Sequence, residues 1–534
     1  MQNLFELLSR SVKLYGDKVF CSIREGRNWR RLSFRQLHDS ALALARGLKA
    51  YGIRPGDNIG ILSENRPEWD IAFFGIIRAG AAVVPIDKLL KKEDRSNILA
   101  RAKPKLIFVS KNYLTAVAES GFTTPVVCFD SNDMAIPTLF ELLLEGENSS
   151  KLPTLRDGTA VLLFTSGTTG DTKGIVLTHE NFISNVEAFF KVFPDGFFQA
   201  NFLSILPLSH AFELTGGFLT PLYGGGTVTF QHSLKPSEIL ETMRDTGTEM
   251  MLAVPAFLEM IRHAILKKID EDPKKRKMFK FVFALSRIPN IAFRRFLFRE
   301  IHASFGGDLR YIVSGGAPLS REIEIFFERL GFGIIQGYGL TEAAPVLTVN
   351  PVNKRKVGTV GPAVPGVELR IAGTPEGEIL AKGANIMKGY YEDPAATATV
   401  LREDFLYTGD IGYLDADGYL TISGRLKNVI VTDTGKKIFP EEIEEKLRRI
   451  TLIKDVCVIG RKKGQDEEVV AVVIPHENVT SEKIWEEIKR INVALSDFKR
   501  VKDVVIWEGE FPKTTTMKVK RRELQSHLEN RPKT

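Results

Sequence analysis

The sequence has few cysteines, no long apolar run and no strong excess of charge of either sign. Its three cysteines, Cys21, Cys128 and Cys457, lie far apart, and none belongs to a C-x-x-C pair. This spacing argues against a disulfide framework or a structural zinc site and favours a reducing compartment. The most apolar stretch begins at Ile71, runs for 16 residues and contains Arg78, whereas a membrane-spanning helix needs about 18 residues or more.

The start of the chain and its net charge argue against further classes of protein. Residues 1–18 lack the basic and apolar segments of a signal peptide, and Leu4, Leu7 and Leu8 recur at helical spacing. The chain carries 73 basic and 66 acidic residues, a net charge of +7. This small excess suits an anionic ligand, but no nucleic-acid-binding motif accompanies it. We therefore expect a soluble, cytoplasmic protein that binds no nucleic acid.

Strand-like and helix-like segments alternate through most of the chain, which is typical of an α/β fold. Residues 58–64 and 81–87 have the pattern of buried strands, and residues 68–80 between them that of a helix ending at Gly80. A strand, a helix and a strand in succession indicate parallel strands covered by helices. At roughly 150 residues per domain, a chain of 534 residues has room for about three to four folding units. We predict a large N-terminal region of stacked, mostly parallel sheets covered by helices.

The pattern changes near residues 423–450. A short strand, a glycine turn and a helix opened by Pro440, with glutamates in its first turn, begin a compact tail. Further strand-like or helical runs follow at 455–460, 467–475, 481–495 and 501–507. We predict an N-terminal domain at 1–426 and a small C-terminal α+β domain at 427–534.

The strongest local motif is LLFTSGTTGDTKG at residues 162–174. Glycines allow backbone N–H groups to approach a phosphate closely, hydroxyl groups add donors, and Lys173 supplies a positive charge. The motif is not a Walker P-loop, because Lys173 lies between Thr172 and Gly174. The alternative interpretation is a flexible turn rich in small residues.

Six further motifs follow the first one along the chain. They are LPLSHAFE (206–213), SGGAPL (314–319), QGYGLTE (336–342), GEILAKGANIMKGYYEDP (377–394), YTGDIGYLDADGYLTISGRLKN (407–428) and FPKTTTMKVKRREL (511–524). In kind and order this series resembles the adenylate-forming (ANL) superfamily, which includes acyl-CoA synthetases, peptide-synthetase adenylation domains and firefly luciferase. Within it the chain is most similar to long-chain fatty acyl-CoA synthetases. The resemblance implies a mobile C-terminal domain.

The resemblance also implies a reaction and its cofactors. The family joins a carboxylate to the α-phosphate of ATP, releases pyrophosphate, and then passes the acyl group to a thiol; the cofactors are ATP, Mg²⁺ and CoA. Glu342 and Thr168 would hold the metal, since a hard cation that bridges phosphates prefers few protein ligands. Asp410 would accept the ribose hydroxyls and Arg425 would contact phosphate and ribose. The other residues implied to bind ATP or AMP are Thr165, Ser166, Gly167, Thr169, Gly170, Lys173, Gly315, Gly316, Ala317, Gln336, Gly337, Tyr338, Gly339 and Thr341.

Catalysis is implied for Lys518, Glu342, Thr168 and His210. Lys518 matches the tail lysine that bridges the acid and the α-phosphate, where a preorganised cation lowers the barrier. Its alternative is one lysine of a solvated basic tail, and the alternative for His210 is a hydrogen-bonded core histidine. Lys427 matches the hinge of the tail domain, and the turn Gly435–Lys437, with Lys436 at its centre, would meet CoA. The sequence departs from the family pattern at Thr172, Asn428 and Met517.

The acid and the acceptor are less determined by the motifs. From Ala211 to Phe230 only Glu213 is charged, and the chain has 35 Phe against 11 Tyr, which suits an apolar tunnel, although phenylalanines are more often core residues. The GRLKN motif continues directly into the following residues. Family ligases that do not transfer the acyl group to CoA carry an insertion near this position. We predict a ligase that forms long-chain acyl-CoA, AMP and pyrophosphate. The alternatives are an acyl carrier protein as acceptor, a medium-chain or aromatic acid, or a catalytically silent ATP or AMP binder.

Residues 274–301 interleave basic residues with six phenylalanines. Such a segment suits the surface of an anionic membrane, from which it could collect fatty acid. The alternative is an amphipathic helical pair that packs its Phe face on the core. The sequence leaves the oligomeric state open between a monomer and a homodimer.

Overall fold

The computed structural model describes residues 1–130, 136–147, 152, 153, 155, 158–166, 172–432, 435–463, 466–477, 479–513 and 519–529. The chain divides into two compact units, of which the first is Met1–Glu368 with Ala381–Leu406 and the second is Leu369–Leu380 with Tyr407–Thr534. It crosses from one unit to the other within β15 (Val367–Ala372), β16 (Gly377–Gly383) and β19 (Phe405–Leu414). The boundary predicted between residues 426 and 427 lies after the last crossing and stays a prediction.

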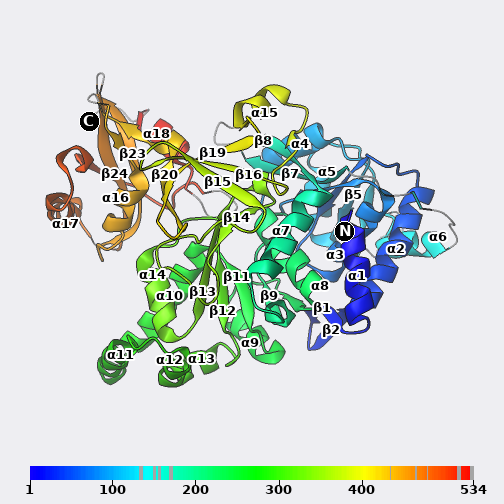
Figure 1. Cartoon of the computed structure of the whole chain (residues 1–534), viewed down its shortest axis with the longest axis horizontal. Coiled ribbons are helices and arrows are strands. Elements are labelled where there is room, and N and C mark those ends of the chain that lie inside the picture. The colour runs from blue at the N-terminus through cyan, green and yellow to red at the C-terminus, as the bar shows by residue number, and fades with distance from the viewer. Residues whose placement is uncertain are drawn as a thin grey trace. The chain divides into compact units, whose positions relative to one another are not determined.

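The first unit contains two large sheets, in which most neighbouring strands are parallel (Figure 1). The strand order of the eight-stranded sheet is β14 (Val346–Val349), β13 (Gly333–Gly339), β12 (Tyr311–Ser314), β11 (Met250–Ala253), β9 (Asn201–Ser204), β10 (Thr227–Phe230), β1 (Val19–Glu25) and β2 (Asn28–Ser33). The order of the seven-stranded sheet is β17 (Gly389–Tyr390), β8 (Thr172–Thr178), β7 (Thr159–Ser166), β4 (Ala82–Ile86), β3 (Asn58–Leu62), β5 (Leu106–Val109) and β6 (Val126–Cys128).

Helices cover these sheets, which confirms the predicted α/β class. Those of the first unit are α1 (Leu4–Tyr15), α2 (Phe34–Ala50), α3 (Pro67–Ala79), α4 (Lys92–Ala102), α5 (Leu114–Ala118), α6 (Leu139–Glu147), α7 (His179–Val192), α8 (Thr220–Gly224), α9 (Pro236–Thr246), α10 (Pro255–Asp270), α11 (Pro273–Leu285), α12 (Ile291–Leu297), α13 (Arg299–Ser304), α14 (Arg321–Leu330) and α15 (Pro394–Val400). Among the described residues, no helix has both the length and the apolar character needed to cross a membrane.

Helix α3 and its flanking strands show how local sequence sets the elements. Pro67 occupies the first helical position, and Gly80 ends the helix in the left-handed conformation with φ of 83°, as expected of proline at a helix start and glycine after its end. Strands β3 and β4 pair in parallel, with Ile59 opposite Val83. The predicted strand–helix–strand unit at 58–87 is therefore confirmed.

The aromatic core of the first unit connects α3 to the π-helical segment Glu213–Leu219. The Phe218 ring lies 6.0 Å from Trp69 and 5.6 Å from Phe73, measured between ring centroids. It also lies 5.9 Å from Phe20 of β1. All four rings are buried, and rings of this size dominate core energetics. This packing anchors the segment that directly follows the LPLSHAF motif.

Glu213, the first residue of the π-helical segment, is a buried carboxyl group in this apolar core. Burial raises the pKa of Glu213 to about 8, and the nearby Ser204 hydroxyl opposes the rise only in part. A Cβ atom on Gly217 would come within 2.5 Å of this carboxyl group. Glu213 is therefore expected to be protonated near neutral pH, because the charged form is poorly solvated there.

The second unit contains the three-stranded sheet β23 (Ile453–Lys463), β24 (Asp466–Pro475) and β25 (Asp503–Ile506). Strands β23 and β24 are antiparallel, and β25 is parallel to β24. The other elements wholly within this unit are β20 (Leu420–Arg425), β21 (Ile430–Val431), β22 (Lys437–Ile438), α16 (Pro440–Leu447), α17 (Ser481–Val493) and α18 (Arg521–Glu529). Strand β18 (Leu401–Arg402) lies in the first unit, and pairs with β19 in the five-stranded sheet β15-β16-β19-β18, on which β20 pairs with β19.

A buried ion pair fixes the C-terminal helix of the second unit. Arg521 donates through Nη1 to Glu444 Oε1 at 2.5 Å and to the Val458 carbonyl oxygen at 2.6 Å. The same Glu444 oxygen accepts from the Val458 backbone N–H at 2.7 Å. Arg521 Nη2 also lies 3.3 Å from Glu441 Oε1. Because both charges are satisfied, removal of one partner should leave the other buried without compensation.

The titration of Glu213 gives a prediction about stability against pH. Because its folded pKa lies above the unfolded value near 4.5, its stabilising effect is complete below about pH 4.5 and is lost as the pH rises toward 8. Relative to Glu213→Gln, the wild type should lose about 3 kcal/mol of unfolding free energy between pH 5 and pH 8. Urea unfolding of both proteins measures this; Glu93→Gln, at an exposed position, is the control. A pH-independent difference would contradict it.

The ion pair of Arg521 gives a second prediction. Glu444→Ala should lower the unfolding free energy of the second unit by about 3 kcal/mol, because it removes the nearer carboxylate of a largely buried guanidinium and leaves only Glu441, at 3.3 Å. Glu445→Ala is the matched control, since the neighbouring Glu445 is exposed and pairs with Arg449 at 3.8 Å; its cost should stay below about 0.5 kcal/mol. Urea unfolding distinguishes the two. Equal effects of the two substitutions would mean that the pair does not anchor α18.

Candidate active site

The phosphate-loop motif is carried by a β-hairpin of the seven-stranded sheet. Strands β7 and β8 are antiparallel, with Thr165 opposite Lys173 and Ser166 opposite Thr172. Thr172, which replaces the family's proline, is buried, and its carbonyl oxygen accepts from Arg101. The predicted phosphate-binding residues Gly167, Thr168, Thr169 and Gly170 lie outside the described residues.

Tyr390 lies between the predicted phosphate lysine and the predicted metal ligand. Lys173 Nζ lies 4.6 Å from the centroid of the Tyr390 ring, within the range of a cation–π interaction. The Tyr390 hydroxyl donates to Glu342 Oε1 at 3.0 Å. Burial and the neighbouring charge of Glu342 raise the pKa of Tyr390, so the hydroxyl keeps its proton and remains a donor.

Strand pairing places Tyr390 in this position. Tyr390 belongs to the two-residue strand β17, which pairs antiparallel with β8, so that Tyr390 is opposite Ile175. Ile175 lies two residues after Lys173 on β8, so Tyr390 is offset by two positions from Lys173 in this strand pairing. Tyr390 belongs to the motif at 377–394, but the sequence motifs predicted no role for it. Its position as an aromatic residue within a family motif could have indicated one.

The turn after Glu342 is fixed by buried polar side chains. Asn185 of α7 and Asn385 both donate through Nδ2 to the carbonyl oxygens of Ala343 and Val346, at 3.0–3.2 Å. Thr215 Oγ1 donates to the Ala344 carbonyl oxygen at 2.9 Å. Because these groups are buried and paired, they hold the turn in one conformation.

The residues predicted to surround adenine come together at the ends of neighbouring strands. Gly315–Ala317 follow β12, Gln336–Gly339 end β13, and these two strands are parallel, with Ser314 opposite Gln336. Ligands of parallel α/β sheets bind at the carboxyl ends of strands. A Cβ atom on Gly339 would come within 1.8 Å of the Pro345 carbonyl oxygen, so only glycine fits beside the turn.

The side chains at these strand ends differ in their contacts. Tyr338 is buried, as a core tyrosine would be. Burial raises the pKa of Glu324 in α14, and the Gly358 backbone N–H, which donates to Glu324 Oε2 at 2.9 Å, opposes this rise. The buried Ser314 hydroxyl has no hydrogen-bond partner in the part of the chain that the structure describes. A polar atom left at the strand end fits a ligand with a polar edge, such as a nucleobase.

His210 has a carboxylate partner on the neighbouring sheet. Its Nε2 lies 2.8 Å from Oδ2 of the buried Asp87, which directly follows β4. Asn65 holds the preceding loop, because its Nδ2 donates to Ser204 Oγ and to the Leu206 carbonyl oxygen. A carboxylate on Nε2 orients the ring and leaves Nδ1 for another partner. Sequence reasoning missed Asp87.

In the second unit, Asp410 and Arg425 form an ion pair. They are opposite one another on β19 and β20, and Arg425 Nε donates to Asp410 Oδ1 at 2.6 Å. Asp410 is buried, and its backbone N–H donates to Thr408 Oγ1 at 3.1 Å. Strand pairing therefore fixes the positions of both charged side chains.

The other predicted residues of the second unit lie on short turns or outside the described residues. Lys427 is exposed in the turn Leu426–Asn428, and Asn428 donates to Glu441 Oε1 at 2.8 Å. Gly435–Lys437 follow β21, and Lys436 Nζ lies 4.6 Å from the Phe498 ring centroid. Lys518 and Met517 lie outside the described residues.

Glu342 fits the chemistry of a magnesium ligand that shares the ion with phosphates. No cluster of three or more His, Cys, Asp or Glu side chains suited to a metal ion occurs in the described ranges. Tyr390 occupies Glu342 Oε1 and leaves capacity on Oε2. Mg²⁺ is commonly bound by one or two carboxylates together with substrate phosphates, so Glu342 could hold it beside a nucleotide.

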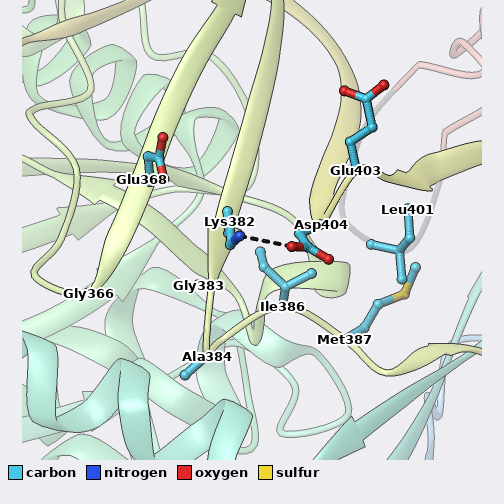
Figure 2. A pocket seen from close by; sticks show the side chains of 10 residues that line it. All are labelled: Gly366, Glu368, Lys382, Gly383, Ala384, Ile386, Met387, Leu401, Glu403 and Asp404. Atoms are coloured by element: carbon cyan, nitrogen blue, oxygen red, sulfur yellow. Dashed lines mark hydrogen bonds and ion pairs between the residues drawn. The ribbon is translucent and has the colours of Figure 1, made fainter.

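A separate cavity of about 810 Å³ lies in the first unit. Figure 2 shows that Lys382 and Asp404 face one another in it, 3.0 Å apart, with Glu368 and Glu403 nearby. None of the predicted site residues lines this cavity. It is therefore not the site that the motifs predict.

Comparisons with known proteins agree with this geometry. Residues 8–391 match the family model described as AMP-binding enzyme, and residues 427–531 match the AMP-binding enzyme C-terminal domain. The chain is 30% identical over 466 residues to the long-chain-fatty-acid–CoA ligase FadD15 of Mycobacterium bovis, which covers 82% of this chain and 76% of that protein. It is 29% identical over 455 residues to the feruloyl-CoA synthase of an Amycolatopsis species, covering 83% and 84%.

A solved structure is similar to this chain along almost its whole length. The ATP-bound RpMatB–BxBclM chimera B1 aligns with a TM-score of 0.81 and 25% identity over 99% of each chain. Together the matches confirm the resemblance and the fold class inferred from the sequence.

The contact between Tyr390 and Glu342 gives a prediction about ligand binding. Tyr390→Phe keeps the ring beside Lys173 but removes the donor to Glu342, so Mg-ATP should bind about tenfold more weakly, as expected for one hydrogen bond to a charged group. Calorimetric titration with Mg-ATP measures this. Tyr391→Phe is the matched control, because the Tyr391 hydroxyl accepts from Asn58 Nδ2 at 3.4 Å and forms no other hydrogen bond among the described residues. Unchanged affinity of Tyr390→Phe would contradict the assignment.

Proposed function

This chain belongs to the AMP-binding enzyme family, and from that membership we propose that it activates a long-chain fatty acid with ATP and transfers the acyl group to CoA. The family and its relatives that are named acyl-CoA ligases support adenylate-forming acyl-CoA ligase activity, whichever acid is activated. The products are acyl-CoA, AMP and pyrophosphate. Such ligases use ATP, Mg²⁺ and CoA.

The arrangement of Lys173, Tyr390 and Glu342 carries the proposal. The first step joins two anions, the fatty acid carboxylate and the α-phosphate of ATP, so the site must supply cations and oriented donors. Lys173 holds the β- and γ-phosphates together with Thr165, Ser166, Thr168 and Thr169. Glu342 holds Mg²⁺, which neutralises phosphate charge. Tyr390 fixes the positions of both side chains through contacts at 4.6 Å and 3.0 Å.

The second unit supplies the remaining contacts to the nucleotide in this proposal. Asp410 accepts the ribose hydroxyls, and Arg425 contacts phosphate and ribose. Lys518 bridges the acid and the α-phosphate as pyrophosphate leaves. The support for Asp410 is its position opposite Arg425 on the neighbouring strand, with Arg425 Nε 2.6 Å from its Oδ1.

The transfer step uses residues of the tail. We assign the hinge to Lys427 and contacts with CoA to the Gly435–Lys437 turn. Two exposed lysines in one turn suit the phosphates of CoA. The acyl carboxylate enters beside His210, whose ring Asp87 orients at 2.8 Å.

A long-chain acid is favoured by two observations. The segment after His210 is apolar and aromatic, with Phe212 within 3.0 Å of a Cβ atom built on Gly315. A relative with 30% identity is named a long-chain-fatty-acid–CoA ligase. An aromatic acid is the second candidate, because the feruloyl-CoA synthase is 29% identical over a similar share of the chain. The proposal also places the protein in the cytoplasm, where residues 274–301 contact the surface of a membrane.

Pyrophosphate release tests the proposal. The protein is given ATP and acids from two to eighteen carbons, together with ferulate, with and without CoA. A long-chain optimum with thioester formation is expected. An optimum with ferulate would mean that the substrate is an aromatic acid. Pyrophosphate release without a thioester would mean that the acceptor is not CoA but another group, such as a carrier protein. No release with any acid would contradict the activity.

The role of Lys518 gives a prediction with a matched control. Lys518→Ala should lower the rate of pyrophosphate release by about 10²- to 10³-fold, as for other preorganised groups that stabilise developing charge, with little effect on Mg-ATP affinity. Lys520→Ala is the control, because Lys520 forms a surface ion pair with Glu523 at 2.8 Å. Similar losses in both variants would assign Lys518 to a general basic tail.

A further inference from the structure

The segment 274–301 forms α11, α12 and the start of α13, at an edge of the first unit (Figure 1). Its phenylalanines divide into two groups. Phe279, Phe283 and Phe298 pack on one another with ring centroids 5.4–6.4 Å apart, and Phe283 lies 5.9 Å from Phe326 of α14. These three rings therefore attach the segment to the core.

The opposite side of α11 carries apolar side chains that the core does not cover. Met278, Phe281 and Leu285 are 60%, 66% and 40% exposed. Their spacing of three and four residues places them on one helix face. Ile288, just after the helix, is 51% exposed. Single exposed apolar residues are ordinary, but a contiguous exposed stripe marks an interaction surface.

Basic residues surround this stripe. From Pro273 to Phe298 the sequence contains eight Lys or Arg residues and no Asp or Glu. Arg294 and Arg295 donate to backbone carbonyl oxygens and serve the fold. The other basic residues are exposed and form no ion pair within the described residues; they are Lys274, Lys275, Arg276, Lys277, Lys280 and Arg287.

The lysines and the apolar stripe share one face of α11. Lys274 precedes Met278 by four residues, and Lys277 precedes Phe281 by four residues, so each lysine lies one helical turn from an exposed apolar side chain. Pro273 at the first helical position and the Asp272 cap, which accepts from the Lys274 backbone N–H at 2.8 Å, preform the helix. The face is therefore built before it meets a partner.

We propose that α11 docks on the surface of a bilayer that contains anionic lipids. Met278, Phe281, Leu285 and Ile288 enter the boundary between headgroups and acyl chains, while the lysines bind lipid phosphates. A helix with an apolar face and basic flanks is the form that lies in this interface. A second copy of the same face is disfavoured, because two surfaces with this excess of positive charge repel.

This inference deepens the membrane contact of the proposed function and does not depend on which acid is activated. A long-chain acid partitions into a bilayer, so docking would place the enzyme where such a substrate is concentrated. Vesicle binding and pyrophosphate release are measured separately, so failure of one is distinguishable from failure of the other.

Co-sedimentation of the full-length protein with vesicles tests the proposal. Vesicles of phosphatidylcholine alone are compared with vesicles that also contain phosphatidylglycerol, at about 50 mM and about 500 mM salt. Binding is expected with the anionic vesicles at low salt and should fall at high salt. Equal binding to both kinds of vesicle, or no binding to either, would overturn the proposal.

Two double variants separate charge from apolar insertion. Lys274→Glu with Lys277→Glu, and Met278→Ser with Phe281→Ser, should each weaken binding at least about tenfold. Lys91→Glu with Lys92→Glu is the charge-matched control at exposed positions of the same unit, and Leu89→Ser, at a side chain that is 60% exposed, is the apolar control. Both controls should bind as the wild type does.

The pattern of the variants decides the nature of the ligand. If only the charge-reversed variant lost binding, the face would bind phosphate groups without entering a membrane, and the proposal would be wrong. Melting temperatures within the error of the wild type confirm that each variant is folded; the substituted side chains are exposed, so this is the expected result.

Discussion

The first unit depends on holding a lysine and a carboxylate near one another without letting them neutralise each other. Tyr390 achieves this with two different parts of one side chain, because its ring faces the Lys173 ammonium and its hydroxyl donates to Glu342. A direct ion pair would occupy both charges, whereas this arrangement leaves them available to a ligand that carries phosphate and metal. Burial protects the hydroxyl proton on which the arrangement depends.

The fold supplies the rigidity that this arrangement needs. Strand β17 pairs with β8 and fixes Tyr390 against the hairpin that carries Lys173. Asn185 and Asn385 bind the same two carbonyl oxygens of the turn after Glu342. These amides come from segments distant in sequence, so the position of Glu342 is set by packing of the whole unit and not by its own short turn.

The second unit uses paired charges for two different purposes. Arg425 pairs with Asp410 across two strands while part of the guanidinium stays exposed, which suits a ligand contact. Arg521 pairs with Glu444 in the interior and anchors α18. The two pairs differ in burial, and in the proposed function the more exposed pair is the one that contacts the nucleotide. In α11 a third arrangement occurs, because exposed lysines surround exposed apolar side chains.

The sequence by itself determined the fold class and the family, and from the family motifs it predicted a set of site residues. Hydrophobic period, proline at helix starts and glycine at helix ends are local signals, and they placed α3 and its flanking strands correctly. Motifs in a fixed order identified Lys173, Glu342 and Asp410 before any contact was known. Only the tertiary structure decided their partners: Asp87 is 123 residues from His210, and Tyr390 is 48 residues from Glu342. It also decided which phenylalanines of residues 274–301 face the core, because burial depends on segments that no local pattern contains.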